Sequence, residues 1–278
     1  MMYEWIRTAG VAVRNAVLGS NLASWRLLGQ PRSYLYFASE ALFLLDALRQ
    51  RRGLPERNVG EHFPDAPRDL PILLDGRPDA PWLGPVTSYL ADLVALCQLC
   101  QLVRPRVVFE IGTFHGYSTL HFALNTPADA VVYSLDLPPD QPQLTLGATV
   151  MDVVIAREGA ATSTYAFSGR EVEAKIRLLH GDSAKFDFSP WHRGVDLFFI
   201  DGAHSYEYVR SDSERALECV RPGGVVAWHD FGRSGVNGVG RCLRELRARG
   251  LDITAVPGGS LAYLVVPRPT GDRSRSAA

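Results

Sequence analysis

The sequence has little cysteine, and its cysteines are too scattered for a disulfide framework. Four cysteines occur among 278 residues, whereas small secreted domains that depend on disulfides are dense in cysteine. The Cys97-x-x-Cys100 pair lies where apolar residues recur at helical spacing, and no second pair or nearby histidine completes a zinc set. We therefore interpret the cysteines as core residues and expect a cytoplasmic protein.

The sequence also lacks an excess of charge of either sign. It has 29 basic and 30 acidic side chains, for a net charge of -1. Binding to nucleic acid is driven by clustered positive charge, so we expect no nucleic-acid partner. Hydrophobic residues make up 46% of the chain, which is enough for one large core with an appendage.

A long hydrophobic run is absent too. The most apolar early segment, Tyr34 to Leu48, is interrupted by acidic residues, and at about 15 residues it is shorter than the roughly 20 that cross a membrane. Charges across residues 1–28 leave no apolar core for a signal peptide. We expect no transmembrane segment. The segment 34–48 is better interpreted as an amphipathic helix on the main domain or on a second subunit, with membrane-surface contact as the less favoured alternative.

Proline and the order of apolar segments divide the chain. Five helix-breaking prolines fall between Pro64 and Pro81, after two or three helical patterns. We expect residues 1–84 to form a helical appendage with a connector or lid, residues 85–267 to form the main domain, and residues 268–278 to be a flexible tail.

Strand-like and helix-like patterns alternate in the main domain. The strand-like runs are Val107 to Ile111, Ala130 to Leu135, Ile176 to His180, Val195 to Ile200 and Val225 to Trp228, with helical patterns over residues 206–220 and 238–249. This alternation predicts an α/β fold with a parallel sheet covered by helices on both faces. Two further runs, Leu251 to Val256 and Leu261 to Val266, flank a Pro-Gly-Gly-Ser turn and predict a hairpin that adds one antiparallel edge strand.

The stretch from Arg106 to Leu120 joins a buried strand to a helix through a glycine turn. Gly112 and Gly116 allow positive φ and the close approach of a ligand, in front of the free N–H groups of the following helix. Glu110 lies within the apolar run, where a carboxylate is costly unless a ligand or nearby backbone satisfies it. A nicotinamide dehydrogenase is less favoured, because Gly112-x-x-x-Gly116 is not the Gly-x-Gly-x-x-Gly that cradles a pyrophosphate.

The motif Glu110-Ile-Gly-Thr-Phe-His-Gly-Tyr-Ser-Thr resembles the first motif of class I methyltransferases that depend on S-adenosylmethionine (SAM), in the form found in catechol O-methyltransferase-like enzymes. Later segments follow in the matching order: Asp136, Gly181-Asp-Ser, Asp201-Gly-Ala-His-Ser-Tyr and His229-Asp. Together they resemble a bacterial methyltransferase group with Asp-Gly-x-His-x-Tyr and His-Asp signatures, over about Val86 to Val266. This resemblance implies a Rossmann-like, seven-stranded, mostly parallel sheet with an antiparallel last strand.

The resemblance also implies a SAM site. Asp136 has near the spacing at which an acidic residue at the end of a second strand reaches ribose hydroxyls, although a turn or cap role is the alternative. Gly112 and Gly116 would lie beside the methionine part of SAM, and Asp182 or Ser183 beside the adenine. The cofactor-binding residues that we expect are Glu110, Gly112, Thr113, Gly116, Ser118, Asp136, Asp182, Ser183 and Asp201.

Candidates for the chemistry fall at the carboxyl ends of the fourth and fifth strands, where ligands bind in open parallel sheets. His204 occupies the position of the lysine base of catechol-type enzymes, and we expect it to act as general base. Asp201 and His229 complete the expected catalytic set.

A divalent metal is a second use for the same residues. By resemblance, Asp201 and Asp230 match two carboxylate ligands of a Mg²⁺ site, but Phe231 replaces the asparagine that is the third ligand there. His204, our tentative third ligand, or His229 would instead favour Mn²⁺, Fe²⁺ or Zn²⁺. Metal dependence therefore stays open.

We expect a SAM-dependent O-methyltransferase that acts on a small hydroxylated molecule such as a sugar or secondary metabolite. An N-methyltransferase for a small amine, without metal, is the alternative. A non-catalytic scaffold with the same fold is a third interpretation, in which the N-terminal helices bind partners; those helices also suggest a homo-oligomer. The long insertion at residues 137–172 is expected to wall the acceptor pocket.

Overall fold

The computed structural model describes residues 53–67, 69–75, 87–140, 143–233 and 236–268. The chain divides into two compact units, Met1–Arg49 and Gln50–Ala278, and every feature below belongs to the second. The predicted helix at residues 34–48, most of the predicted appendage and the tail beyond Arg268 lie outside the described residues.

A seven-stranded sheet crosses this unit in the order β3-β2-β1-β4-β5-β7-β6. The strands are β1 (Val107–Ile111), β2 (Val131–Asp136), β3 (Ile176–His180), β4 (Val195–Ile200), β5 (Val220–Trp228), β6 (Thr254–Ala255) and β7 (Ala262–Val265). Strands β1 to β5 pair in parallel, and β7 pairs antiparallel with both β5 and β6. This confirms the predicted Rossmann-like α/β fold.

One detail of the prediction was wrong: the antiparallel strand is not at the edge. The turn before β7 folds it back against β5, with which it pairs over four residues, from Val225 with Val265 to Trp228 with Ala262. Strand β6 has only two residues and pairs outside β7, so β6 is the edge. Strand β7 has four residues and β6 has two, so β7 has more backbone N–H and C=O groups to satisfy, and β5 offers them partners.

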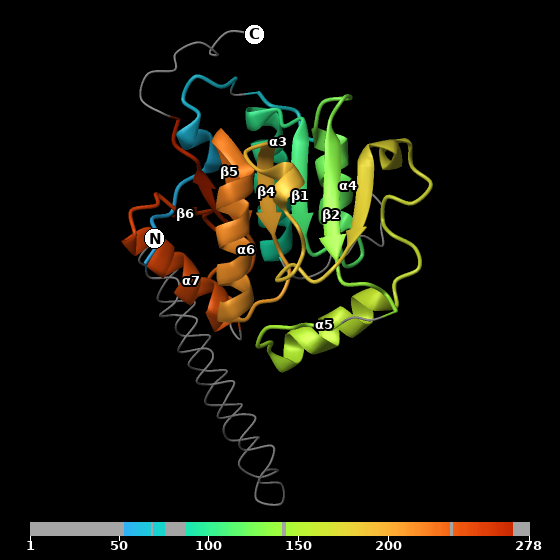
Figure 1. Ribbon diagram of the computed structural model, residues 1–278. Coiled ribbons are helices and arrows are strands. Elements are labelled where there is room, and N and C mark those ends of the chain that lie inside the picture. The colour runs from blue at the N-terminus through green and yellow to red at the C-terminus, as the bar shows by residue number, and fades with distance from the viewer. Residues whose placement is uncertain (1–52, 68, 76–86, 141–142, 234–235, 269–278) are drawn as a thin grey trace, which may run out of the picture. The chain divides into compact units, whose positions relative to one another are not determined.

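Helices cover both faces of the sheet (Figure 1). Helices α3 (Thr87–Val103) and α4 (Tyr117–Asn125) lie on one face, and α6 (Tyr206–Cys219) and α7 (Asn237–Ala248) on the other. Helix α5 (Val150–Ala160) belongs to the predicted insertion and lies across the end of the sheet at which β1 and β2 finish. Short 3-10 helices occupy Val59–His62, Glu171–Lys175 and Ser189–Trp191.

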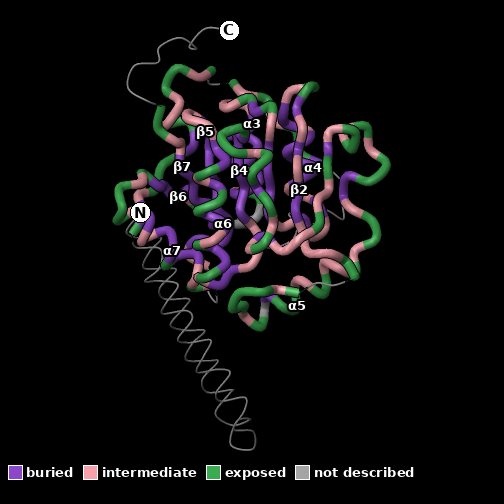
Figure 2. Tube along the Cα trace, viewed as in Figure 1, coloured by how far each residue is buried: buried purple, intermediate pink, exposed green. Residues whose placement is uncertain are grey.

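The core has two layers because successive strand residues point to opposite faces. Phe109 of β1 packs in one cluster with Val209 and Leu243 of α6 and α7. Its neighbour Val108 packs in the other cluster with Leu120 of α4. Figure 2 shows the resulting contrast between buried central strands and the largely exposed α5.

The residues before α3 also pack on this unit. Arg57 N donates to Ala255 O at 3.0 Å, and Ala255 N donates to Pro55 O at 2.9 Å, while the Leu54 side chain is buried in the core. The compact unit therefore extends back to Gln50, beyond the expected boundary at residue 85.

All four cysteines are free and buried, as the core interpretation predicted. Among the described residues, no helix combines the length and apolar character needed to cross a bilayer.

Candidate active site

Two positions in the turn between β1 and α4 require glycine because of packing within the protein. Gly112 has a φ of 99°, and a Cβ atom there would lie 2.1 Å from the carbonyl oxygen of Asp201. Gly116 caps α4 with a φ of 74°, and a Cβ there would lie 2.6 Å from the Phe167 ring. A side chain at either position would therefore meet both backbone strain and a collision. The predicted positive φ is present at both glycines.

Asp136, at the end of β2, holds this turn in place. Its Oδ2 accepts hydrogen bonds from the backbone N–H of Thr113 at 3.1 Å and of Phe114 at 2.8 Å, and its Oδ1 accepts from Leu137 N at 2.8 Å. A carboxylate offers about four acceptor sites, so about one stays available for a ribose hydroxyl. The structure thus adds a turn-fastening role that sequence reasoning had treated only as the alternative.

Glu110 is fully buried beneath the turn. Its Oε2 accepts hydrogen bonds from the hydroxyls of Thr119 at 2.5 Å and Ser134 at 2.6 Å, whereas its Oε1 has no hydrogen-bond partner among the described residues. Burial raises the pKa of Glu110 to about 7, although the surrounding hydroxyls oppose that shift. Side-chain hydroxyls, rather than the ligand or backbone expected from sequence, satisfy half of this carboxyl group.

A pocket opens between the glycine turn, the end of β4 and α5. The space between these elements amounts to about 610 Å³, part of it open to solvent. Of the predicted cofactor residues, Gly112, Asp136, Asp182, Ser183 and Asp201 line it. Those that do not line it are Glu110, Thr113, Gly116 and Ser118.

Asp182 connects three parts of the pocket wall. Its Oδ1 accepts a hydrogen bond from the Tyr208 hydroxyl of α6 at 2.9 Å, and its Oδ2 accepts from Thr145 N of the insertion at 3.0 Å. The carboxylate of Asp182 therefore anchors the insertion to the ends of the parallel strands. The insertion was expected to wall an acceptor pocket, and through α5 it lines the same pocket as the predicted cofactor residues.

Asp152 on α5 is a site residue that sequence reasoning missed. Its Oδ1 lies 2.8 Å from His204 Nδ1 and accepts from His204 N at 2.9 Å. The Thr149-x-x-Asp152 spacing is a capping-box signal, and both capping bonds are present. This signal could have predicted a helix cap, but not a partner for histidine.

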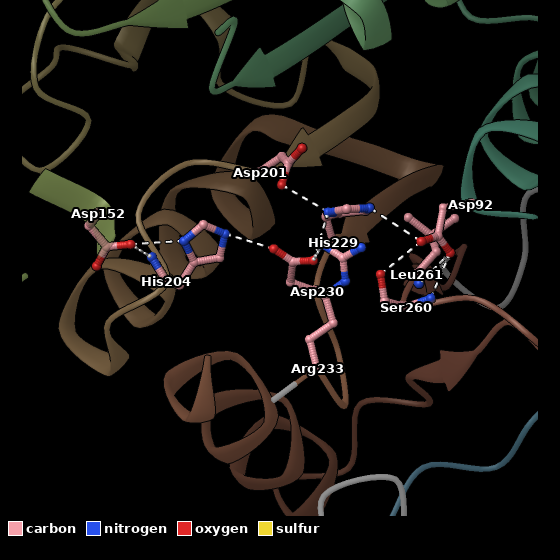
Figure 3. Close-up of polar contacts among 9 residues, drawn as sticks. All are labelled: Asp92, Asp152, Asp201, His204, His229, Asp230, Arg233, Ser260 and Leu261. Carbon is pink, nitrogen blue, oxygen red and sulfur yellow. Dashed lines mark hydrogen bonds and ion pairs between the residues drawn. The ribbon is translucent and has the colours of Figure 1, made fainter. Parts of the chain in front are cut away.

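The four predicted catalytic and metal residues converge, as Figure 3 shows. His229 Nδ1 lies 3.1 Å from Asp201 Oδ1 and 3.2 Å from Asp230 Oδ1. His204 Nε2 lies 2.8 Å from the other oxygen of Asp230. Asp230 has a φ of 62°, a left-handed conformation that is uncommon for aspartate and turns its carboxylate back between the two histidines.

Both histidines are held as cations in this arrangement. Burial lowers the pKa of His204, but hydrogen bonds to Asp152 and Asp230 outweigh burial and raise the pKa to about 10. Burial also lowers the pKa of His229, yet the charges of Asp201 and Asp230 raise it well above its ordinary value. His204 is therefore not the free imidazole that a general base requires at neutral pH, because a carboxylate occupies each of its nitrogens.

The converging donor atoms could hold a divalent metal, with His229 in place of His204 as the third ligand. One ligand atom each from Asp201, His229 and Asp230 lies within 4.8 Å of the others. Two carboxylates with an imidazole favour Mn²⁺, Fe²⁺ or Zn²⁺ over Mg²⁺. Phe231 is buried in the core and offers no ligand, and Arg233 already pairs with Asp230 Oδ1 at 2.8 Å.

The strand order and the pocket define a Rossmann-like α/β protein whose ligand site lies at the carboxyl ends of its parallel strands. A sequence model described as a methyltransferase domain matches residues 109–231. This matched part of the chain is similar to a methyltransferase domain, in agreement with the motifs in the sequence.

Two curated plant proteins and one solved structure are among the proteins that resemble this chain. Tricin synthase 1 from Oryza sativa subsp. japonica is 28% identical over 170 residues, or 59% of each chain. Caffeoyl-CoA O-methyltransferase from Stellaria longipes is 27% identical over 142 residues, 51% of this chain and 52% of the relative. The chain thus spans only half to three fifths of these curated relatives. Among solved structures, the O-methyltransferase TomG from Streptomyces achromogenes has a TM-score of 0.44 and 22% identity, covering 75% of this chain and 86% of that one.

Proposed function

We propose that this protein transfers the methyl group of SAM to an oxygen of a small hydroxylated molecule, such as a sugar or secondary metabolite. The observation that carries the proposal is the convergence of Asp201, His204, His229 and Asp230 beside a pocket that the glycine turn and Asp136 also line or support. Similarity to caffeoyl-CoA O-methyltransferases supports oxygen as the acceptor atom. A cytoplasmic location and a homo-oligomer are further parts of the proposal, supported by free cysteines and the predicted N-terminal helices respectively.

In this proposal, the chain mainly positions its two substrates. Methyl transfer requires an in-line approach of the acceptor oxygen to the SAM methyl group, and such positioning contributes much of the rate. Asp136 and the amides of the glycine turn hold the nucleoside side, while Glu110 is buried beneath the turn, where the Thr119 and Ser134 hydroxyls donate to it. The end of β4 presents Asp201 and His204 to the acceptor.

A divalent cation held by Asp201, His229 and Asp230 would supply a Lewis acid that lowers the pKa of the acceptor hydroxyl. Proton removal is assigned to His204, which lines the pocket, whereas His229 does not. Because its pKa is raised to about 10, His204 accepts a proton only in the minor fraction of molecules in which its imidazole is neutral. The rate should therefore rise with pH above neutrality.

A metal-free N-methyltransferase is the second candidate, and one observation favours it. Arg233 already neutralises an oxygen of Asp230 that the metal would need. An amine acceptor loses its proton more readily than an alcohol, so its methylation would not depend on Lewis-acid assistance.

Calorimetry with S-adenosylhomocysteine and the full chain tests the cofactor, and the proposal fails if no binding heat appears. Transfer of a radiolabelled methyl group from SAM to matched panels of phenols, sugars and amines then identifies the acceptor atom. Loss of O-methylation in EDTA, with recovery in Mn²⁺, is the expected result. His204→Gln should remove the alkaline rise in rate; an unchanged pH profile would exclude His204 as base.

A further inference from the structure

Asp92 is a buried acid on an otherwise apolar stretch of α3. Its Oδ1 accepts hydrogen bonds from Ser260 N at 2.7 Å and Leu261 N at 2.9 Å. Its Oδ2 accepts from the Ser260 hydroxyl at 2.7 Å and lies 3.3 Å from His229 Nε2. Figure 3 shows this carboxylate on the side of the His229 ring opposite Asp201 and Asp230.

The hairpin between β6 and β7 is built around this carboxylate. A Cβ atom at Gly259 would lie 2.0 Å from Asp92 Oδ1, so a side chain at that position would displace the carboxylate. Neighbouring Gly258 has no heavy atom within 4 Å of an added Cβ. The close approach at Gly259 is therefore specific to the position of Asp92.

The Asp92 carboxylate engages the nitrogen of His229 that faces away from Asp201 and Asp230. A carboxylate only accepts hydrogen bonds, so the His229 nitrogen that faces it carries a hydrogen. Nε2 is thereby kept as an N–H donor, and Nδ1 is the nitrogen directed at Asp201 and Asp230. A metal-binding histidine commonly has this arrangement, in which its second nitrogen donates to a carboxylate that sets ring orientation and tautomer.

We propose that Asp92 is a positioning residue that holds the His229 ring with Nε2–H toward α3 and directs Nδ1 at Asp201 and Asp230, where a divalent cation would displace the hydrogen on Nδ1. This inference rests on the proposed function for the identity of the cation site. It adds a residue remote in sequence from every motif of the main domain, and it links α3, the β6–β7 hairpin and the reaction centre.

Asp92→Asn separates this positioning from a purely structural role. The amide oxygen would still have to accept the two backbone N–H groups of Ser260 and Leu261, which directs the amide NH₂ group toward His229 Nε2. Two donors would then face each other, so His229 would lose the hydrogen on Nε2 and keep the one on Nδ1, which faces Asp201 and Asp230. An aspartate-to-asparagine change in serine protease triads likewise leaves the histidine in the wrong tautomer. Ser260→Ala is the matched control, because it removes one donor to Asp92 but leaves the carboxylate beside His229.

The first measurement is nitrogen NMR of the full chain with labelled histidine, with the His229 signals assigned by comparison with His229→Gln. We expect Nε2 to carry hydrogen in the wild-type protein and in Ser260→Ala, and to lose it in Asp92→Asn. The proposal is overturned if Asp92→Asn leaves Nε2 protonated while the protein remains folded.

The second measurement is a Mn²⁺ titration, in which electron paramagnetic resonance reports the concentration of free Mn²⁺. Loss of such a supporting carboxylate commonly weakens metal binding roughly 10- to 100-fold, and we expect the Mn²⁺ affinity of Asp92→Asn to fall by that factor. The S-adenosylhomocysteine affinity of Asp92→Asn and the Mn²⁺ affinity of Ser260→Ala should stay at the wild-type values. Equal Mn²⁺ affinity in Asp92→Asn and the wild-type protein would contradict the proposal. If the wild-type protein itself takes up no Mn²⁺, the metal part of the proposed function fails, and the NMR comparison alone decides the role of Asp92.

Discussion

Replacing Glu110 with glutamine should change how stability depends on pH. Glu110 is fully buried in β1, and two hydroxyls donate to one of its oxygens. Burial raises its pKa from the ordinary 4.5 to about 7 in the folded protein. Glutamine has nearly the same shape but does not ionise, and the two hydroxyls can still donate to its amide oxygen.

The sign and size follow from linkage. Below pH 4.5 the carboxyl is protonated in both states, so the folded protein has its full stability. Between pH 4.5 and about 7 it ionises in the unfolded chain before it ionises in the fold, and stability falls as the pH rises. At about 1.4 kcal/mol per pH unit, the fall amounts to about 3 kcal/mol and is complete above pH 7.

Urea unfolding of wild type and Glu110→Gln from about pH 4 to about pH 8 measures this difference. The free energy of unfolding of the variant, relative to wild type, should increase by about 3 kcal/mol over that interval. Exposed Glu171 provides the control variant Glu171→Gln, whose difference from wild type should stay nearly constant. If the difference in unfolding free energy between Glu110→Gln and wild type were also constant with pH, the reasoning would be refuted. The Glu110 carboxylate would then ionise as readily in the folded protein as in the unfolded chain.

Two further predictions concern the pocket. Asp152→Asn should lower the pKa of His204 below its value of about 10, because a charged hydrogen-bond partner becomes neutral; histidine NMR across a pH titration checks this, and an unchanged pKa would contradict it. Gly112→Ala should destabilise the fold by about 3 kcal/mol or more, since strain and a collision combine. Gly250→Ala is its matched control: φ is 98° there, but nothing lies within 4 Å of the added Cβ, so thermal unfolding should show a cost of about 1 kcal/mol.

Local chemistry explains why much of this protein could be predicted from its sequence. The apolar runs at Val107–Ile111 and Val195–Ile200 can be satisfied only as strands buried on both faces, and the structure places strands over those same residues. Because parallel strands finish at one edge of a sheet, residues that follow separate strands, such as Asp201 and Asp230, are brought together by topology alone. Position along a strand was therefore enough to predict which residues gather.

Tertiary structure decided what those residues contact and which charge they carry. Asp92 and Asp152 come from helices far away in the sequence, and only the packing of α3 and α5 places their carboxylates on His229 and His204. An acid in an apolar helix was a visible signal at Asp92, but a sequence does not specify the partner of such an acid. Charge depends on distance and burial. The sequence therefore determined the fold and the convergence of Asp201 and Asp230. The three-dimensional arrangement added Asp92 and Asp152, made His204 a cation, and brought His229, rather than His204, to the two aspartates as a third donor.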